Sequence, residues 1–268
     1  MILVLGGTLE GREIANDLAA RGYSVLLTVV SGYGVEMVPR EAPFEVLAGE
    51  LDAGALERLI TEKSIKLIVD ATHPYAARIT EIAWETAGRK GIRYIRYDRP
   101  PVAGESAGIT ESGGKTECGS MAFRAGSYGE AAELAVTLGD TVFLTIGSRN
   151  LEPFVRAGKV SGKRIVARVL PDAKVLEQCS VLGFPPRDII AVQGPFSMEL
   201  NLAMLKEYGA DVLVTKDSGS VGGTDKKLAA AARLGIPVVI VARPDYSGIP
   251  VTGKIREVLR QAGETDKK

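Results

Sequence analysis

The chain carries two residues whose chemistry and position suggest catalysis, His73 and Lys216. His73 is the single histidine, and an imidazole can exchange a proton near neutral pH. Lys216 follows an apolar run, and a lysine ammonium can pair with a carboxylate or a phosphate. Each has a structural alternative: His73 can cap a helix before Pro74, and Lys216 can be an exposed residue at a strand end. The residues alone leave both interpretations open.

Other polar side chains occur at the same kind of position, directly after a predicted strand. They are Thr8, Glu10, Ser31, Asp70 to His73, Ser148, Arg149, Gln193, Ser197 and Lys216 to Ser218. Arg149 and Arg243 are candidate anion clamps, with salt bridges as the alternative. Asp217 and Ser218 can instead form a turn. Ligands of open parallel sheets bind outside the carboxyl ends of the strands, so this set predicts a ligand site there.

The N-terminal stretch predicts a strand, a glycine turn and a helix. Ile2–Leu5 is an apolar run, Gly6 and Gly7 break it, and Thr8 can cap the helix that follows. The unpaired N–H groups and positive dipole of a helix start suit a phosphate. The dinucleotide fingerprint would place glycine at 6, 8 and 11, and this chain has threonine at the middle position. The alternative is a glycine turn that only lets the helix pack on the sheet.

The end of the second predicted strand, Val25–Val30, carries no signal for one nicotinamide over the other. Many NAD-binding folds place an acid here against the ribose hydroxyls, and an arginine here accommodates a 2′-phosphate. The chain has Ser31, Gly32, Tyr33 and Gly34 instead. The sequence therefore leaves NADH and NADPH open.

Two series of alternating strands and helices must position these groups. In the first half, strands are predicted at Ile2–Leu5, Val25–Val30, Phe44–Leu47, Lys66–Val69 and Ile92–Tyr97. In the second half, they are predicted at Val142–Ile146, Arg164–Val169, Ile189–Val192, Val212–Thr215 and Val238–Val241. Helices between such strands imply parallel sheets with right-handed connections. The predicted fold class is α/β, with two Rossmann-like, doubly wound parallel-sheet domains and a cleft between them.

The stretch Val102–Ser127 is rich in Gly, Ser, Glu and Thr and shows little periodicity, which predicts a linker or a long surface loop that can contain a hairpin. The expected domains are residues 1–100, binding the dinucleotide, and residues 128–268, completing the substrate cleft, with 101–127 between them. A weak repeat relates the halves: Gly-Ile and Arg-Pro stand at identical spacing in residues 91–100 and 235–244.

Composition excludes several classes of partner. The chain has 268 residues with 33 basic and 33 acidic side chains, so no basic excess points to nucleic acid or a membrane surface. No basic leader or bilayer-length apolar run is evident, and Cys118 and Cys179 form no Cys-x-x-Cys motif. We expect a reducing, cytoplasmic setting. One histidine excludes a histidine-rich metal site within one chain, and no metal is expected. The sequence carries no signal for an oligomeric state.

A set of short motifs resembles the precorrin-6A reductase family of corrin (vitamin B12) biosynthesis, including its cobalt-precorrin-6A reductases. The motifs are Gly6 to Gly11, Asp70 to Ile79, Ile146 to Leu151, Arg168 to Pro171, Gln193 to Ser197 with Glu199 and Asn201, Lys216 to Gly219 with Gly222 and Gly223, and Arg243-Pro244. The resemblance extends to about residue 245, nearly the whole chain. The turn at Gly6 is common to many proteins, whereas the other motifs in this order are specific.

The resemblance implies a reductase that passes a hydride from NADPH or NADH to one double bond of the precorrin-6A or cobalt-precorrin-6A macrocycle, giving the precorrin-6B form. It implies two Rossmann-like domains with cofactor and macrocycle between them. The cofactor-binding candidates are Gly6, Gly7, Thr8, Glu10, Ser31, Gly32, Tyr33, Asp70, Thr72, His73 and Pro74. The substrate-binding candidates are Tyr75, Ser148, Arg149, Gln193, Ser197, Lys216, Asp217, Ser218, Gly219, Gly222, Gly223 and Arg243. His73 and Lys216 are the catalytic candidates.

The chemistry of the residues agrees with that reaction. Hydride transfer needs orientation and charge stabilisation more than a protein nucleophile. The macrocycle bears many carboxylates, which Arg149, Arg168, Lys216 or Arg243 can hold. The proton that completes the reduction can come from His73, water or a substrate carboxylic acid. The alternative function is a non-catalytic dinucleotide-binding regulator, which would use the Gly6–Thr8 turn and need no large anionic cleft.

Overall fold

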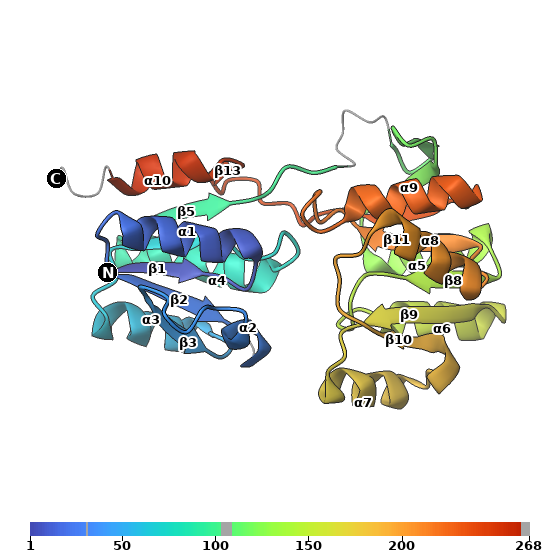
Figure 1. The fold of residues 1–268 in the computed structure, drawn as a ribbon, viewed down its shortest axis with the longest axis horizontal. Coiled ribbons are helices and arrows are strands. Elements are labelled where there is room, and N and C mark those ends of the chain that lie inside the picture. The colour runs from blue at the N-terminus through green and yellow to red at the C-terminus, as the bar shows by residue number, and fades with distance from the viewer. Residues whose placement is uncertain (31, 103–108, 264–268) are drawn as a thin grey trace. The chain divides into compact units, whose positions relative to one another are not determined.

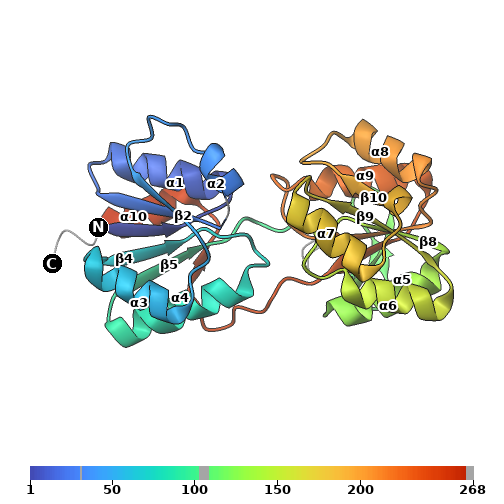
Figure 2. The same cartoon turned by 90° about the horizontal axis from the view of Figure 1, so that it is seen from below.

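The computed structural model describes residues 1–30, 32–102 and 109–263, and its chain folds as two compact units (Figure 1). Unit 1 comprises Met1–Pro100 together with the chain from Pro244 onward, and unit 2 comprises Pro101–Arg243. Each unit has its own sheet with helices on both faces, as Figure 2 shows. The α/β class and the two Rossmann-like units are therefore confirmed.

Unit 1 is built on a six-stranded parallel sheet in the order β13-β5-β4-β1-β2-β3. Its strands are β1 (Ile2–Leu5), β2 (Val25–Val29), β3 (Glu45–Ala48), β4 (Leu67–Asp70), β5 (Arg93–Tyr97) and β13 (Val251–Thr252). Its helices are α1 (Leu9–Ala20), α2 (Gly32–Glu36), α3 (Ala53–Glu62), α4 (Ala77–Lys90) and α10 (Ile255–Gly263).

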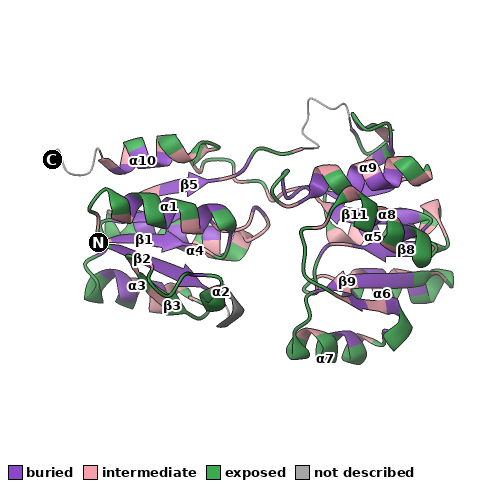
Figure 3. Cartoon of the chain, viewed as in Figure 1, coloured by how far each residue is buried: buried purple, intermediate pink, exposed green. Residues whose placement is uncertain are grey.

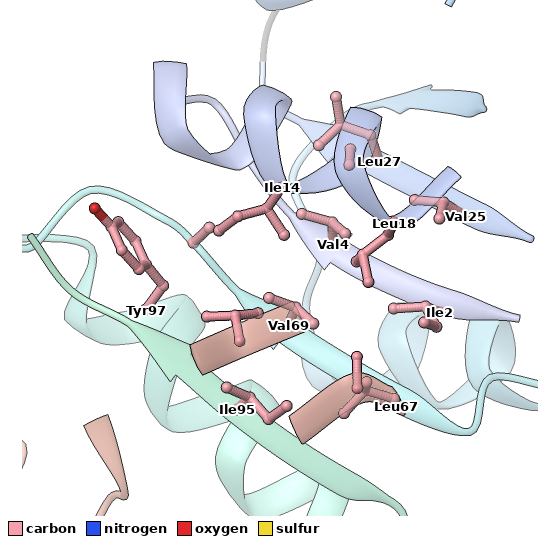
Figure 4. Close-up of a cluster of buried hydrophobic side chains, with 14 of the residues drawn as sticks. Ile2, Val4, Ile14, Leu18, Val25, Leu27, Leu67, Val69, Ile95 and Tyr97 are labelled. Atoms are coloured by element: carbon pink, nitrogen blue, oxygen red, sulfur yellow. The ribbon is translucent and has the colours of Figure 1, made fainter. Parts of the chain in front are cut away.

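The central strand β1 is buried along its whole length because helices cover both faces of the sheet (Figure 3). Ile2 and Val4 belong to the core formed with α1 and α10, shown in Figure 4. Leu3 and Leu5 belong to the opposite core, formed with α3 and α4. Successive side chains of a strand point to opposite faces, so a continuous apolar run is what a sheet covered on both sides requires.

Unit 2 is built on a seven-stranded sheet in the order β10-β9-β8-β11-β12-β7-β6, parallel except for the β6–β7 pair. Its strands are β6 (Gly114–Lys115), β7 (Met121–Ala125), β8 (Thr141–Leu144), β9 (Arg164–Val169), β10 (Ile189–Ala191), β11 (Val212–Lys216) and β12 (Val238–Val241). Its helices are α5 (Tyr128–Leu138), α6 (Glu152–Ser161), α7 (Ala173–Leu182), α8 (Met198–Glu207) and α9 (Thr224–Leu234), with a 3₁₀ turn at Pro186–Asp188.

Two of the predicted domain boundaries are wrong. The stretch 101–127 is not a linker between domains: it contains the hairpin that the sequence allowed, β6 and β7, which joins the unit 2 sheet where β7 pairs with β12. The chain after Pro244 does not stay in the second half either, because β13 pairs with β5 and α10 packs on α1 in unit 1. The strand β7 is hard to predict from the sequence because it is short and has polar, glycine-rich flanks. The position of α10 is hard to predict because its apolar stripe could cover the sheet of either unit.

Candidate active site

The turn between β1 and α1 is held closed by Thr8. Its hydroxyl caps α1 by accepting a hydrogen bond from Gly11 N at 3.0 Å and donates to Ala71 O at 2.7 Å. Thr8 therefore ties the turn to the loop after β4, and the single donor of its hydroxyl is engaged within the protein. The turn offers a ligand its backbone rather than the Thr8 side chain.

The glycines of this turn are required for two different reasons. A Cβ on Gly6 would lie 2.5 Å from Leu27 Cδ1, and one on Gly11 would lie 3.1 Å from the Gly6 Cα, so both allow close packing. Gly7 instead has φ of +97°, a conformation that side chains strain, and nothing lies within 4 Å of the position of its Cβ. The open space outside Gly7 and the helix start beside it fit a dinucleotide phosphate.

The other cofactor-binding candidates of this region are Glu10 and residues 31–33. Glu10 is buried and forms an ion pair with Arg99 at 2.8 Å, so its carboxylate holds the chain near the end of the first segment of unit 1. Ser31 lies outside the described residues, as does the side chain of Tyr33. The backbone of Gly32 and Tyr33 begins the short helix α2, which the sequence did not predict.

Asp70, the last residue of β4, anchors the loop that carries His73. Its side chain is 0% exposed. It accepts hydrogen bonds from Thr72 N and Oγ1, Thr80 Oγ1, Tyr94 OH and Arg96 Nη1, at 2.7–3.0 Å. Burial and the Asp70 carboxylate both raise the pKa of Tyr94, which keeps that phenol a donor. The Asp70 carboxylate thus holds the loop through Thr72 and is itself enclosed by its hydrogen-bond donors.

The returning C-terminal segment contributes a second anchor for the same loop. Tyr246 O–H donates to Pro74 O at 2.7 Å, and the guanidinium of Arg96 lies 4.2 Å from the centroid of its ring. Burial raises the pKa of Tyr246, so the phenol remains protonated at neutral pH. Pro74 is therefore held from a segment 172 residues away in sequence.

The N-cap of α4 is Ala76, so His73 does not cap that helix as its structural alternative predicted. Its side chain instead stabilises the turn before the helix. Its Nδ1 accepts a hydrogen bond from Tyr75 N at 3.2 Å, and the two rings lie 5.7 Å apart. An imidazole that accepts at Nδ1 carries its exchangeable proton at Nε2. The helix after this turn, α4, begins at Ala77, because residues 73–76 form the turn itself. A role of Nε2 in proton transfer stays a prediction.

In unit 2, Lys216 ends β11 and begins a tightly packed loop. Burial, together with the nearby positive charge of Arg149, lowers the pKa of Lys216 to about 8. Ser218 N donates to Thr224 Oγ1 at 3.0 Å, and a Cβ on Gly222 would lie 2.4 Å from Ser218 Cβ. Gly223, with φ of +70°, then caps α9.

Asp217 and Arg243 are joined, as the salt-bridge alternative for Arg243 predicted. Arg243 Nε donates to Asp217 O at 2.9 Å, and its Nη2 lies 3.8 Å from Asp217 Oδ1. The same Oδ1 accepts from Val102 N at 3.0 Å and from Gly219 N at 3.2 Å. Asp217 thus fixes its own loop and both ends of the unit 2 chain.

The remaining candidates lie on the loops after β8 and β10. Ser197 caps α8 by accepting from Leu200 N at 3.2 Å, which is a structural role. Arg149 and Gln193 are exposed, and Ser148 is half-buried with its carbonyl accepting from Gln178 Nε2. Nothing in these contacts assigns them to a ligand, and their substrate-binding roles stay predictions.

Comparison with known proteins decides the family. The family model described as "Precorrin-6x reductase CbiJ/CobK" matches residues 1–262. The chain belongs to the precorrin-6A reductase family. The cobalt-precorrin-6A reductase of Priestia megaterium is 36% identical over 260 residues, covering 97% of this chain and 96% of that protein.

More distant relatives show the same likeness over comparable lengths. The precorrin-6A reductase of Sinorhizobium sp is 34% identical over 269 residues, covering 97% of this chain and 91% of that protein. A solved structure of "CobK precorrin-6A reductase" has the same fold, with a TM-score of 0.75 at 23% identity, covering 98% of this chain and 96% of that one. The reaction of the family is hydride transfer from a nicotinamide dinucleotide to a carbon–carbon double bond of the macrocycle in cobalamin biosynthesis.

Two cations of the precorrin-6A reductase fold carry little signal at strand ends: Arg168 on β9, which is half-buried, and Lys227 on α9, which is buried. Arg168, named only as a possible partner of the macrocycle, has its pKa lowered to about 10 by burial. Lys227 was missed entirely and is 6% exposed. A signal for it exists: Lys227 shares the apolar stripe of α9 with Ala230 and Ala231, at i+3 and i+4. Across the described part of this reductase, none of the helices is long and apolar enough to cross a membrane.

Proposed function

We propose that unit 1 binds the nicotinamide dinucleotide at the β1–α1 turn and that the loop after β11 in unit 2 holds carboxylates of the macrocycle. The two edges would then serve one reaction, reduction of precorrin-6A or its cobalt form. The observation that carries the proposal is the turn itself: Gly6 and Gly11 allow close packing while Gly7 leaves open space beside the start of α1. Backbone N–H groups there would hold the pyrophosphate.

The chain's own residues have defined tasks in this scheme. The bound dinucleotide supplies the hydride. Asp70 and Tyr246 fix the loop that presents His73, and Lys216 offers a positive charge to the macrocycle. To donate the proton that completes the reduction, His73 would first be protonated to the imidazolium, which requires Nδ1 to release its hydrogen bond from Tyr75 N.

His73 can be tested by separating its two functions. Asparagine at 73 can keep an acceptor near Nδ1 for the Tyr75 amide but cannot serve as the acid. If His73 is the proton donor, His73→Asn lowers turnover by roughly a hundredfold or more while the protein remains folded. Turnover within about twofold of the unchanged enzyme would leave His73 only its role in the turn, and the proton would come from elsewhere.

The choice of dinucleotide and of substrate form is the finer part of the proposal. With neither an acid nor an arginine at residues 30–34, we propose that the enzyme discriminates weakly between NADH and NADPH. Relatives named for the cobalt form and for the metal-free form match at similar identity, so both substrates belong in the test. Cys118 and Cys179 are free thiols, which supports a reducing, cytoplasmic setting.

The deciding experiment is turnover of purified protein with NADH and NADPH, each with precorrin-6A and with cobalt-precorrin-6A. We expect oxidation of the dinucleotide only when a macrocycle is present, with the macrocycle spectrum changing in step. Dinucleotide binding without macrocycle-dependent oxidation would support the alternative, a non-catalytic regulator, and contradict the proposed reaction.

A further inference from the structure

Lys227 is a buried lysine whose side-chain ammonium has no hydrogen-bond partner among the described residues. It lies on the first turns of α9 and is 6% exposed. Within the part of the chain that the structure describes, its Nζ donates no hydrogen bond. A buried ammonium is strongly unfavourable unless a charge or hydrogen bonds compensate for its lost hydration. A lysine held in this condition therefore requires an explanation beyond packing.

The groups around Lys227 supply only part of the missing compensation, although Asp225 has a buried Oδ1 with no hydrogen-bond partner among the described residues. The positive charges of Arg168 on β9 and Lys216 on β11 act on it, as do the negative charges of Asp217 and Asp225. Asp217 is already engaged by Arg243, Val102 N and Gly219 N. Arg168 donates to Asn201 Oδ1 on α8 at 2.8 Å and stacks on Phe196. Positive charge therefore exceeds available negative charge at this end of the sheet.

The N-terminal end of α9 adds further positive electrostatic potential near Lys227. The helix runs for 11 residues, and its N-cap, Gly223, makes no side-chain cap. Thr224 N donates to Gly219 O at 3.3 Å, and Asp225 in the first turn offsets part of the positive helix end. Side chains of a helix lean toward its N-terminus, which brings the Lys227 ammonium toward that end. A helix start, a buried unpaired lysine and two neighbouring cations together form an environment suited to an anion.

We propose that Lys227 is the buried cation of a carboxylate-binding subsite for the macrocycle at the start of α9. The proposal rests on the proposed function, because the macrocycle is the ligand there that bears several carboxylates. Lys227 is the deep member of the subsite, and Lys216 at the end of β11 is the neighbouring one. A phosphate of the dinucleotide is the other anion that the same chemistry would accept, and the two are separated below.

Binding at this subsite should take up protons. Burial, with repulsion from Arg168 and Lys216, lowers the pKa of Lys227 to about 7. A carboxylate beside the ammonium favours its charged form and raises that pKa. At pH 8 the empty site is therefore largely neutral at Lys227 and binding takes up a proton, whereas at pH 6 the lysine is already charged. Macrocycle affinity should fall as pH rises from 6 to 8.

The test compares Lys227→Met with Lys226→Met, which changes the exposed neighbour on the same helix. Each variant is titrated with the macrocycle and, separately, with NADH and NADPH, at pH 6 and pH 8. Calorimetry in buffers of different ionisation enthalpy counts the protons taken up. We expect Lys227→Met to weaken macrocycle binding about tenfold to a hundredfold, as for a lost charge-assisted contact, and to reduce proton uptake at pH 8. Lys226→Met should change neither.

A stability measurement separates this role from a structural one. Removing an incompletely compensated buried charge should raise the melting temperature of Lys227→Met, most at or below pH 7, because the unfolded lysine is charged up to its ordinary pKa. Lys227→Gln serves as a second variant. Unchanged macrocycle affinity in both variants, or loss confined to the dinucleotide, overturns the subsite alone. If the unchanged protein does not bind the macrocycle at all, the proposed function fails first, and the subsite with it.

Discussion

The ends of the two sheets treat buried charge in opposite ways. In unit 1, Asp70 and Arg96 are both 0% exposed and form an ion pair at 2.8 Å, with Thr72, Thr80 and Tyr94 completing the hydrogen bonds of the carboxylate. In unit 2, Lys227 is almost as deeply buried and has no such partner among the described residues. The ion pair in unit 1 stabilises a loop, whereas the positive charge of Lys227 in unit 2 remains available to an anionic ligand.

This difference separates structural from functional polar groups more sharply than residue type does. Asp70 is a cofactor-binding candidate in the sequence because of its place at a strand end, yet its carboxylate is enclosed. Lys227 looks like a helix-surface residue, yet it is buried with only part of its charge compensated. Buried ion pairs such as Asp70–Arg96 should therefore control the free energy of unfolding. Lys216 and Lys227 should control macrocycle affinity and turnover.

The largest expected effect is on stability in unit 1. Asp70→Ala leaves the buried Arg96 charge without its carboxylate and should lower the free energy of unfolding by about 3–5 kcal/mol. Urea denaturation followed by circular dichroism measures it. The matched control is Asp245→Ala, which removes an exposed carboxylate that also accepts a hydrogen bond from a backbone N–H, that of Ser247. A loss at Asp70 no greater than at Asp245 would remove the contrast between the two units.

The next largest effect is expected on turnover, with dinucleotide affinity unchanged. Lys216→Ala removes one charge-assisted contact with the macrocycle and should lower kcat/KM by about tenfold to a hundredfold, equivalent to about 1.5–3 kcal/mol. Lys206→Ala, on the exposed face of α8, is the control. If a folded Lys216→Ala enzyme keeps both its turnover and its macrocycle affinity, the loop after β11 is not the substrate site.

The β1–α1 turn allows backbone strain to be separated from ligand access. Gly7→Val places a branched side chain at a positive φ and should cost about 1–2 kcal/mol of stability. Gly22→Val does the same at the other end of α1, where φ is +87° and the Cβ position is also open. We expect both variants to lose similar stability, and only Gly7→Val to lose dinucleotide affinity, by about tenfold or more. Equal affinities in the two variants would place the phosphates elsewhere.

The smallest effect concerns the anchor from the returning segment. Tyr246→Phe removes the hydrogen bond to Pro74 O but keeps the ring beneath Arg96, so stability should fall by only about 0.5–1.5 kcal/mol. If the anchor positions the His73 loop, kcat falls while the KM for the dinucleotide is retained. Tyr94→Phe removes another buried hydroxyl on the same cluster and is the comparison. Identical kinetic changes in both would indicate a general loss of stability.

Much of the fold was predictable because it depends on short-range patterns. The apolar run of β1 requires a sheet covered on both faces, and the capping roles of Thr8 and Ser197 depend on residues three positions away. The repeated Arg-Pro at 99–100 and 243–244 marks the two places where the chain passes between units, although the sequence showed only an equivalence of halves. The family could be recognised from motifs that are each local.

What only the tertiary structure decided involves partners distant in sequence. The ion pair of Glu10 with Arg99 spans 89 residues, and Tyr246 reaches Pro74 across 172. The apolar stripe of α10 fits a sheet face of either unit, and its place on unit 1 depends on β13 pairing with β5. The same holds for Lys227: its helix position was visible in sequence, but its exposure depends on how α9 packs against α8 and the sheet. Local sequence sets conformation and facing direction, whereas burial and charge compensation are properties of the elements that meet.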